Sequence, residues 1–118
     1  MRRVLLVDDE VRILRFAALV LKNAGYDVIT ETSGEKAVEL AQSAKPDIIV
    51  LDILMPDVDG FEVLKRIRAF SDAPVLAFSA RAGVGDKAIE SGANDYLAKP
   101  FDPNELVRRI SALLPPDD

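Results

Sequence analysis

Short apolar runs alternate with amphipathic stretches along the whole chain. Val4-Leu5-Leu6-Val7 and Ile48-Ile49-Val50-Leu51 are continuous apolar runs, the second rich in β-branched residues. Runs this short and this apolar are typical of strands buried on both faces of a sheet. The pattern predicts strands over residues 3–7, 26–30, 47–51, 74–78 and 95–98.

The stretches between the strands have the signals of helices. Gly25 fits a left-handed cap after the first helix, and Ser33 fits an N-cap of the second. Asp102-Pro103-Asn104-Glu105 places a capping Asp, a first-turn Pro and a Glu three residues after the cap. Helices are predicted over 10–23, 34–44, 60–69, 84–91 and 103–114. Five alternating βα units predict a doubly wound (βα)5 fold of the α/β class, a parallel sheet with helices on both faces.

Length and composition indicate one domain of ordinary size. The chain has 118 residues, of which 49% are hydrophobic and 30% charged. It has no cysteine, no apolar stretch near the ~18–20 residues that span a bilayer, and no signal-peptide layout at Met1-Arg2-Arg3-Val4. We expect a cytoplasmic domain over 1–114, followed by a short tail over 115–118, with no membrane contact.

Charge and histidine content narrow the chemistry. The net charge is −5, which disfavours direct binding to nucleic acid. Because histidine is absent, Ser-His-Asp and Cys-His catalysis and histidine metal ligation are excluded. The remaining chemistry must use carboxylates, lysine, hydroxyls and a hard metal ion.

Polar residues that suit this chemistry close four of the five strands. Asp8-Asp9 follow the first strand, Asp52 the third, Ser79 the fourth and Lys99 the fifth. Since ligands of parallel sheets bind beyond the carboxyl ends of the strands, we expect these side chains to share one pocket. Grouped carboxylates repel one another unless a cation joins them, and oxygen ligands alone favour Mg²⁺. A phosphoryl group would suit the space beside Lys99 and Ser79, since phosphoryl transfer requires no histidine base.

With these residues the chain resembles the receiver domain of two-component response regulators, from Val4 to about Leu114. The motifs are Leu6-Val7-Asp8-Asp9-Glu10, Asp47-Ile48-Ile49-Val50-Leu51-Asp52-Ile53-Leu54-Met55-Pro56-Asp57-Val58-Asp59-Gly60, Ser79-Ala80 and Gly92-Ala93-Asn94-Asp95-Tyr96-Leu97-Ala98-Lys99-Pro100-Phe101. The resemblance implies a flavodoxin-like fold with strand order 2-1-3-4-5.

The resemblance also implies roles for single residues. Asp52 would be the phosphoacceptor and would receive the phosphoryl group from a phosphohistidine of a histidine kinase or of a histidine phosphotransfer protein. Lys99 would pair with Asp52 and then with a phosphoryl oxygen, and Ser79 would hydrogen-bond another oxygen. Tyr96 would be an aromatic switch that turns inward when Ser79 moves. The Lys99–Pro100 peptide bond would be cis.

The resemblance also implies a magnesium site and a surface for dimerisation. Asp9, Asp52 and the backbone carbonyl of Leu54 would bind Mg²⁺ directly, and Asp8 would hold a metal-bound water. The domain would promote its own phosphorylation and dephosphorylation without being an enzyme in the usual sense. A homodimer could form through the fourth helix, fifth strand and fifth helix, while the output partner or fused effector is not predicted.

The fourth helix is expected to depart from the family pattern. Ser79 and Lys99 are two positions closer together than in most receivers, and the missing residues fall within 86–91. Ala82-Gly83-Val84-Gly85 is also a poor helix-forming segment. We predict a short, displaced or mobile fourth helix.

Several alternatives stay open at this stage. The first helix is apolar on more than one face, which fits either deep burial or an exposed patch that docks a kinase's helical bundle. A phosphatase of the haloacid-dehalogenase type needs a second Asp two positions after the nucleophile, where this chain has Leu54. A flavodoxin-like cofactor carrier lacks its phosphate loop here, and the intact acidic set argues against a degenerate receiver. Asp57 and Asp59 are interpreted as loop and cap residues.

Overall fold

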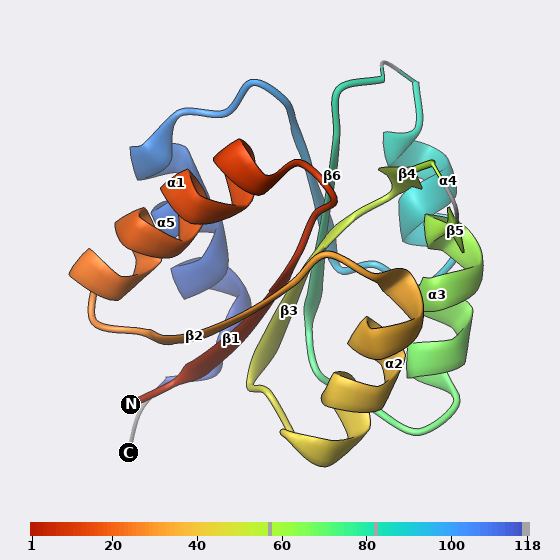
Figure 1. Cartoon of the computed structure of the whole chain (residues 1–118), viewed down its shortest axis with the longest axis horizontal. Helices are drawn as coiled ribbons and strands as arrows, with labels where there is room; N and C mark the ends of the chain where they lie inside the picture. The colour runs from red at the N-terminus through yellow and green to blue at the C-terminus, as the bar shows by residue number, and fades with distance from the viewer. Residues whose placement is uncertain (57, 82, 117–118) are drawn as a thin grey trace.

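Five parallel strands form one sheet in the order β2-β1-β3-β6-β7 (Figure 1). The computed structural model describes residues 1–56, 58–81 and 83–116. The strands of the sheet are β1 (Arg3–Val7), β2 (Asp27–Glu31), β3 (Ile48–Asp52), β6 (Val75–Ser79) and β7 (Asp95–Ala98). Each predicted strand is confirmed to within one residue, and the doubly wound strand order is the one that the resemblance implies.

Helices cover both faces of the sheet, as predicted (Figure 1). They are α1 (Val11–Asn23), α2 (Gly34–Ser43), α3 (Gly60–Arg68), α4 (Gly85–Glu90) and α5 (Pro103–Leu113). Helices α1 and α5 lie on one face, and α2, α3 and α4 lie on the other. None of the described helices is long and apolar enough to cross a bilayer.

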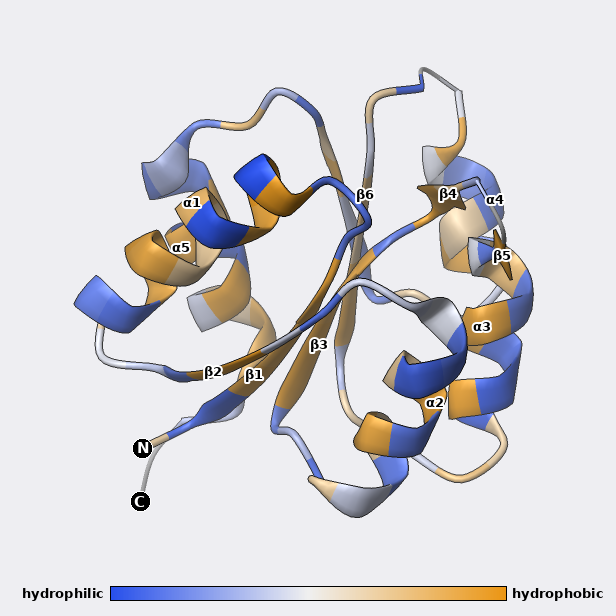
Figure 2. Ribbon diagram, in the orientation of Figure 1, coloured by the Kyte–Doolittle hydropathy of each residue, from blue (hydrophilic) through white to orange (hydrophobic). Residues whose placement is uncertain are grey.

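Alternating side chains of the strands divide the core into two clusters. Leu5 and Val7 of β1 face α2 and α3, whereas Val4 and Leu6 face α1 and α5. All four are fully buried, which explains why the strand reads as an unbroken apolar run rather than as an alternating one. Figure 2 shows the same apolar character along the central strands.

The predicted helix boundaries are set by side-chain caps. Ser33 accepts a hydrogen bond from the Lys36 N–H, and Asp102 accepts one from the Asn104 N–H at 2.7 Å. Asp59 caps α3 by accepting from the Phe61 N–H at 2.9 Å, which confirms its interpretation as a cap residue. Asp57, interpreted as a loop residue, lies outside the described residues.

A two-stranded ribbon and the short helix α4 lie near the carboxyl edge of the sheet, and the sequence predicted only the second. Strands β4 (Leu54–Met55) and β5 (Val58–Asp59) pair as a small antiparallel ribbon that the sequence did not predict, because two-residue strands have no detectable periodicity. Helix α4 has only six residues and no side-chain cap at its N-terminus, so the prediction that it is short is confirmed.

Arg68, at the end of α3, connects the loops on the opposite edge of the sheet. Its guanidinium donates to the carbonyl oxygens of Gly92, Ser71 and Ala73, and to Oδ1 of Asn94. Burial lowers the pKa of Arg68, although the Asp72 carboxylate opposes this effect. The segment that joins α4 to β7 is therefore tied to α3.

Gly60 begins α3 in a space that admits no side chain. A Cβ atom at this position would lie 2.3 Å from the carbonyl oxygen of Ile53, which also accepts a hydrogen bond from the Gly60 N–H. Because the obstacle is backbone, Gly60→Ala should lower the free energy of unfolding by about 2–3 kcal/mol, measured by urea unfolding.

Gly25→Ala is the matched control for this prediction. Gly25 has φ +99° with nothing within 4 Å of a built Cβ, so its replacement introduces backbone strain without a clash. The expected loss is about 1 kcal/mol. Equal losses for the two variants would contradict the steric explanation at Gly60.

Candidate functional site

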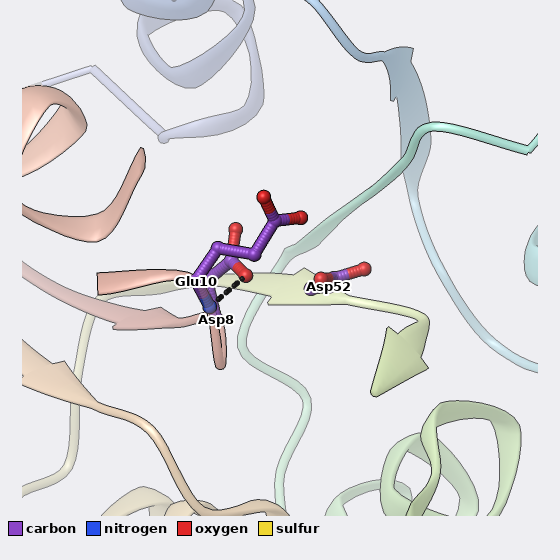
Figure 3. Close-up of side chains that lie close together, drawn as sticks. All are labelled: Asp8, Glu10 and Asp52. Carbon is purple, nitrogen blue, oxygen red and sulfur yellow. Dashed lines mark hydrogen bonds between the residues drawn. The ribbon is translucent and has the colours of Figure 1, made fainter. Parts of the chain in front are cut away.

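Three carboxylates from different elements meet at the carboxyl edge of the sheet. Asp8 follows β1, Glu10 precedes α1, and Asp52 ends β3 (Figure 3). One carboxylate oxygen from each lies within 4.8 Å of the others. Asp8 and Asp52 are 0% and 2% exposed, so two of the three charges are removed from bulk water.

Tight turns after the strands orient the polar side chains. Asp8 Oδ1 accepts a hydrogen bond from the Glu10 N–H at 2.9 Å, and Asp52 Oδ1 accepts one from the Leu54 N–H at 2.9 Å. In each case the side chain bonds to a backbone N–H two residues further on, a common local motif of Asp. The second oxygen of each carboxylate therefore remains for the pocket.

Lys99 brings a positive charge into the middle of this group. Its Nζ lies 2.8 Å from Asp8 Oδ2, 3.1 Å from Asp52 Oδ2 and 3.3 Å from Glu10 Oε1. The ammonium also lies 4.9 Å from the centre of the Phe78 ring. The Lys99–Pro100 peptide bond is cis, as the resemblance implies.

The pKa values reflect burial and the excess of negative charge. Burial raises the pKa of Asp8, and the neighbouring Asp52 carboxylate adds to the increase. Burial alone would lower the pKa of Lys99, but its contacts with Asp8 and Asp52 outweigh burial, and the net pKa is raised. Lys99 is therefore charged at neutral pH, and one ammonium faces three carboxylates.

The oxygen set fits a hard cation. Asp8 Oδ2 is buried, and no donor among the described residues makes an aligned hydrogen bond to it, so its 2.8 Å contact with Lys99 is an ion pair without hydrogen-bond geometry. Buried carboxylate oxygens without donors are costly unless a cation compensates them. The group of Asp8, Glu10 and Asp52 could hold a metal ion, and hard divalent cations prefer such oxygen ligands.

Asp9 is not one of the three carboxylates that lie within 4.8 Å of one another. It is partly buried and lines a hollow with Thr32, Gly34 and Pro56, among others. Burial raises its pKa. The structure thus brings together Asp8, Asp52 and Lys99 of the predicted set, and the charges of Asp8, Glu10 and Lys99 act on the Asp9 carboxylate.

Glu10 is the site residue that the sequence interpretation missed. It belongs to the quoted Asp8-Asp9-Glu10 run, yet it was given no role. Its position directly after the acidic pair, at the start of α1, was the available signal.

Ser79 ends β6, and Tyr96 lies in the neighbouring strand β7. Ser79 is fully buried, and its Oγ accepts a hydrogen bond from the Arg81 N–H at 3.0 Å. The Tyr96 hydroxyl donates to the Arg81 carbonyl oxygen at 3.2 Å, and the carbonyl oxygen of Ser79 lies 3.4 Å away. The Tyr96 ring also packs against Gly85 at the start of α4, where a built Cβ would lie 3.0 Å from it. Tyr96 therefore connects the loop after Ser79 to α4.

The fold and this site define the class of protein. The family model of the response regulator receiver domain matches residues 4–111, and the chain belongs to this family. Receiver domains of two-component systems are signalling modules that are phosphorylated on an aspartate, and they are not classical enzymes.

Individual relatives agree with this assignment. The alkaline phosphatase synthesis transcriptional regulatory protein PhoP of Bacillus subtilis is 42% identical over 116 residues, which cover 96% of this chain and 48% of PhoP. The DNA-binding dual master transcriptional regulator RpaA of Synechocystis is 43% identical over 119 residues, which cover 97% of this chain and 49% of RpaA. The chain thus spans about half the length of these curated relatives.

Solved structures show the same fold. The structure of chemotaxis response regulator CheY4 of Vibrio cholerae matches with a TM-score of 0.90 and 34% identity, covering 97% of this chain and 99% of CheY4. A putative response regulator from Chloroflexus aurantiacus matches with a TM-score of 0.87 and 37% identity, and the match covers 95% of this chain and 96% of that protein.

Asp8→Asn should stabilise the metal-free domain. A carboxyl whose pKa is raised by folding binds protons more tightly in the folded state, so its contribution to stability falls as pH rises through that pKa. At neutral pH the substitution should raise the free energy of unfolding by about 1 kcal/mol, measured by urea unfolding with EDTA. The gain should shrink in acid, where wild-type Asp8 is protonated.

The same variant should respond less to divalent cations. A ligand that binds only the folded state stabilises it according to its concentration and affinity. Millimolar Mg²⁺ should raise the unfolding midpoint of the wild type more than that of Asp8→Asn. A variant that is destabilised in EDTA would contradict the conclusion that burial of this charge is costly.

Proposed function

We propose that the domain accepts a phosphoryl group on Asp52 and reports it through a change of shape around Ser79 and Tyr96. The observation that carries the proposal is the position of Asp52 Oδ2. This oxygen lies 3.1 Å from Lys99 Nζ, while Oδ1 of the same carboxylate is held by the Leu54 N–H. One oxygen is oriented by backbone, and the other faces the positive charge that a phosphoryl group requires.

The transfer step requires positioning and charge neutralisation. An oxygen of the Asp52 carboxylate attacks phosphorus, the bond from phosphorus to the donor's leaving atom breaks, and that atom keeps the electron pair. Lys99 neutralises negative charge on a phosphoryl oxygen. The Ser79 hydroxyl already accepts a bond from the Arg81 N–H, so its own proton remains to be donated to another phosphoryl oxygen.

We propose that the carboxylates bind Mg²⁺ for this step. Asp8 Oδ2, which contacts Lys99 without an aligned hydrogen bond, and the adjacent Asp52 support the proposal, since both offer oxygens to a hard cation. Direct ligation by Asp9 and by the Leu54 carbonyl, with Asp8 acting through a water, stays a prediction. When bound, the ion would neutralise negative charge that faces the phosphoryl group.

Tyr96 is proposed to read the state of Ser79. Its hydroxyl lies against the Ser79–Arg81 loop, and its ring lies against Gly85 of α4. A displacement of Ser79 toward a phosphoryl oxygen would move the loop carbonyls that Tyr96 contacts. The change would then reach α4, β7 and α5, the face for which homodimerisation stays a prediction.

The partner is proposed to be a histidine kinase or a histidine phosphotransfer protein that contacts α1. The predicted deep burial of this helix applies to Leu14 and Leu21, whereas Val11, Phe16 and Leu19 are 47%, 49% and 59% exposed. The exposed side chains support the proposal that this helix docks a partner. Such a patch, on the helix that follows Asp8, can accept apolar side chains of a helical partner.

Output by the full-length protein is a separate proposal. PhoP and RpaA are transcriptional regulators about twice as long as this chain, which suggests a DNA-binding output outside the receiver domain. The receiver itself has a net charge of −5, and we expect it to make no direct contact with nucleic acid. The cytoplasmic location stays a prediction.

Phosphorylation is tested by intact-protein mass spectrometry after incubation with acetyl phosphate and Mg²⁺. The wild type should gain one phosphoryl group, and Asp52→Asn should gain none. Asp102→Asn is the matched control, because Asn caps a helix as well as Asp does, and this variant should be labelled like the wild type. A gain that survives Asp52→Asn would refute the proposed acceptor.

Leu19→Lys tests the docking surface. A panel of autophosphorylated histidine kinases is screened, and the kinase that transfers its phosphoryl group fastest to the wild type is chosen. The transfer rate is measured as the loss of labelled phosphate from that kinase. A charge in a desolvated apolar contact should reduce this rate at least about tenfold. Labelling by acetyl phosphate should not change, since Leu19 lies on α1 away from the pocket. An unchanged kinase rate would exclude this surface.

A further inference from the structure

The side chain of Glu10 contacts Lys99 instead of capping the helix that it precedes. It is the N-cap residue of α1, but its side chain makes no capping hydrogen bond to that helix. Its carboxylate instead lies 3.3 Å from Lys99 Nζ, across 89 positions of sequence. The preceding turn orients it, because the Glu10 N–H donates to Asp8 Oδ1.

Exposure separates Glu10 from the other carboxylates around Lys99. The Asp8 and Asp52 side chains are 0% and 2% exposed, whereas that of Glu10 is 56% exposed. Glu10 is thus the carboxylate of this group that solvent reaches, and Figure 3 shows it beside Asp8 and Asp52. Because the carboxylate oxygens of Glu10 and Asp52 lie within 4.8 Å of one another, the charge of Glu10 acts on any phosphoryl group that reaches Asp52.

We propose that Glu10 selects phosphodonors by charge, an inference that rests on the proposed phosphorylation of Asp52. Small phosphodonors are anions, and Glu10 adds a negative charge beside the Lys99 ammonium that attracts them. The repulsion grows with the charge of the donor. A protein donor can offset it by placing a cationic side chain against Glu10, whereas a small free dianion cannot. Glu10 therefore acts as a specificity-determining residue and takes no part in bond formation.

The test compares two small donors that differ in charge. Acetyl phosphate is a dianion at neutral pH, and phosphoramidate carries one negative charge. Labelling of Asp52 is followed by intact mass with Mg²⁺ at low ionic strength, over a range of donor concentrations. Glu10→Gln should raise the apparent second-order rate constant for acetyl phosphate by about three- to tenfold, and that for phosphoramidate by a clearly smaller factor.

Three controls separate charge from structure. Glu39→Gln removes the same charge from an exposed position of α2 and should leave the ratio of the two donors at its wild-type value. Glu10→Asp keeps the charge and should also keep that ratio. The advantage of Glu10→Gln for acetyl phosphate should disappear at high salt, because exposed charges are screened.

Each outcome decides the proposal. Equal factors for the two donors, or no change for either, would overturn it. Slower labelling with both donors, together with weaker Mg²⁺ binding by titration calorimetry, would also overturn it and would make Glu10 a metal ligand. Failure of the wild type to be labelled by either donor would instead refute phosphorylation of Asp52, so the two failures are distinguishable.

Discussion

The shared contact of Lys99 with Asp8, Glu10 and Asp52 is the interaction on which the site depends. Carboxylates this close, two of them buried, would destabilise the fold strongly without a cation between them. Lys99 supplies that cation from the end of the edge strand β7, and its raised pKa keeps it charged. Because one ammonium offsets only part of three negative charges, the pocket retains an attraction for a further cation.

The sheet explains how such a site can be held in place. The side chains of β1 and β3 are buried on both faces of the sheet. This packing fixes the strand ends, and with them the positions of Asp8 and Asp52. Turns in which each aspartate bonds to an N–H two residues on then set the carboxylate direction. The polar chemistry sits where regular apolar packing ends, which is typical of doubly wound folds.

Most of this arrangement could be predicted because its causes are local. Apolar runs marked the strands, Ser33 and Asp102 marked helix starts, and the strand-end position of Lys99 marked its place beside Asp8 and Asp52. The β4–β5 ribbon could not be predicted, because two-residue strands depend on the tertiary position of the loop. The contact of Glu10 with Lys99 depends on the direction of a side chain after a turn, which residue spacing does not encode.

Arg68 gives the short helix α4 unequal ends. At its C-terminal end, the Gly92 carbonyl is bonded to a guanidinium that also binds two further carbonyls, and Ala88 is fully buried. At its N-terminal end, no side chain caps the helix, and Gly85 contacts the Tyr96 ring. The C-terminal end of α4 is therefore held by polar bonds, whereas its N-terminal end is held by the packing of Val84 and Gly85. The surface that α4 presents near Tyr96 can therefore change while the opposite edge of the domain keeps its shape.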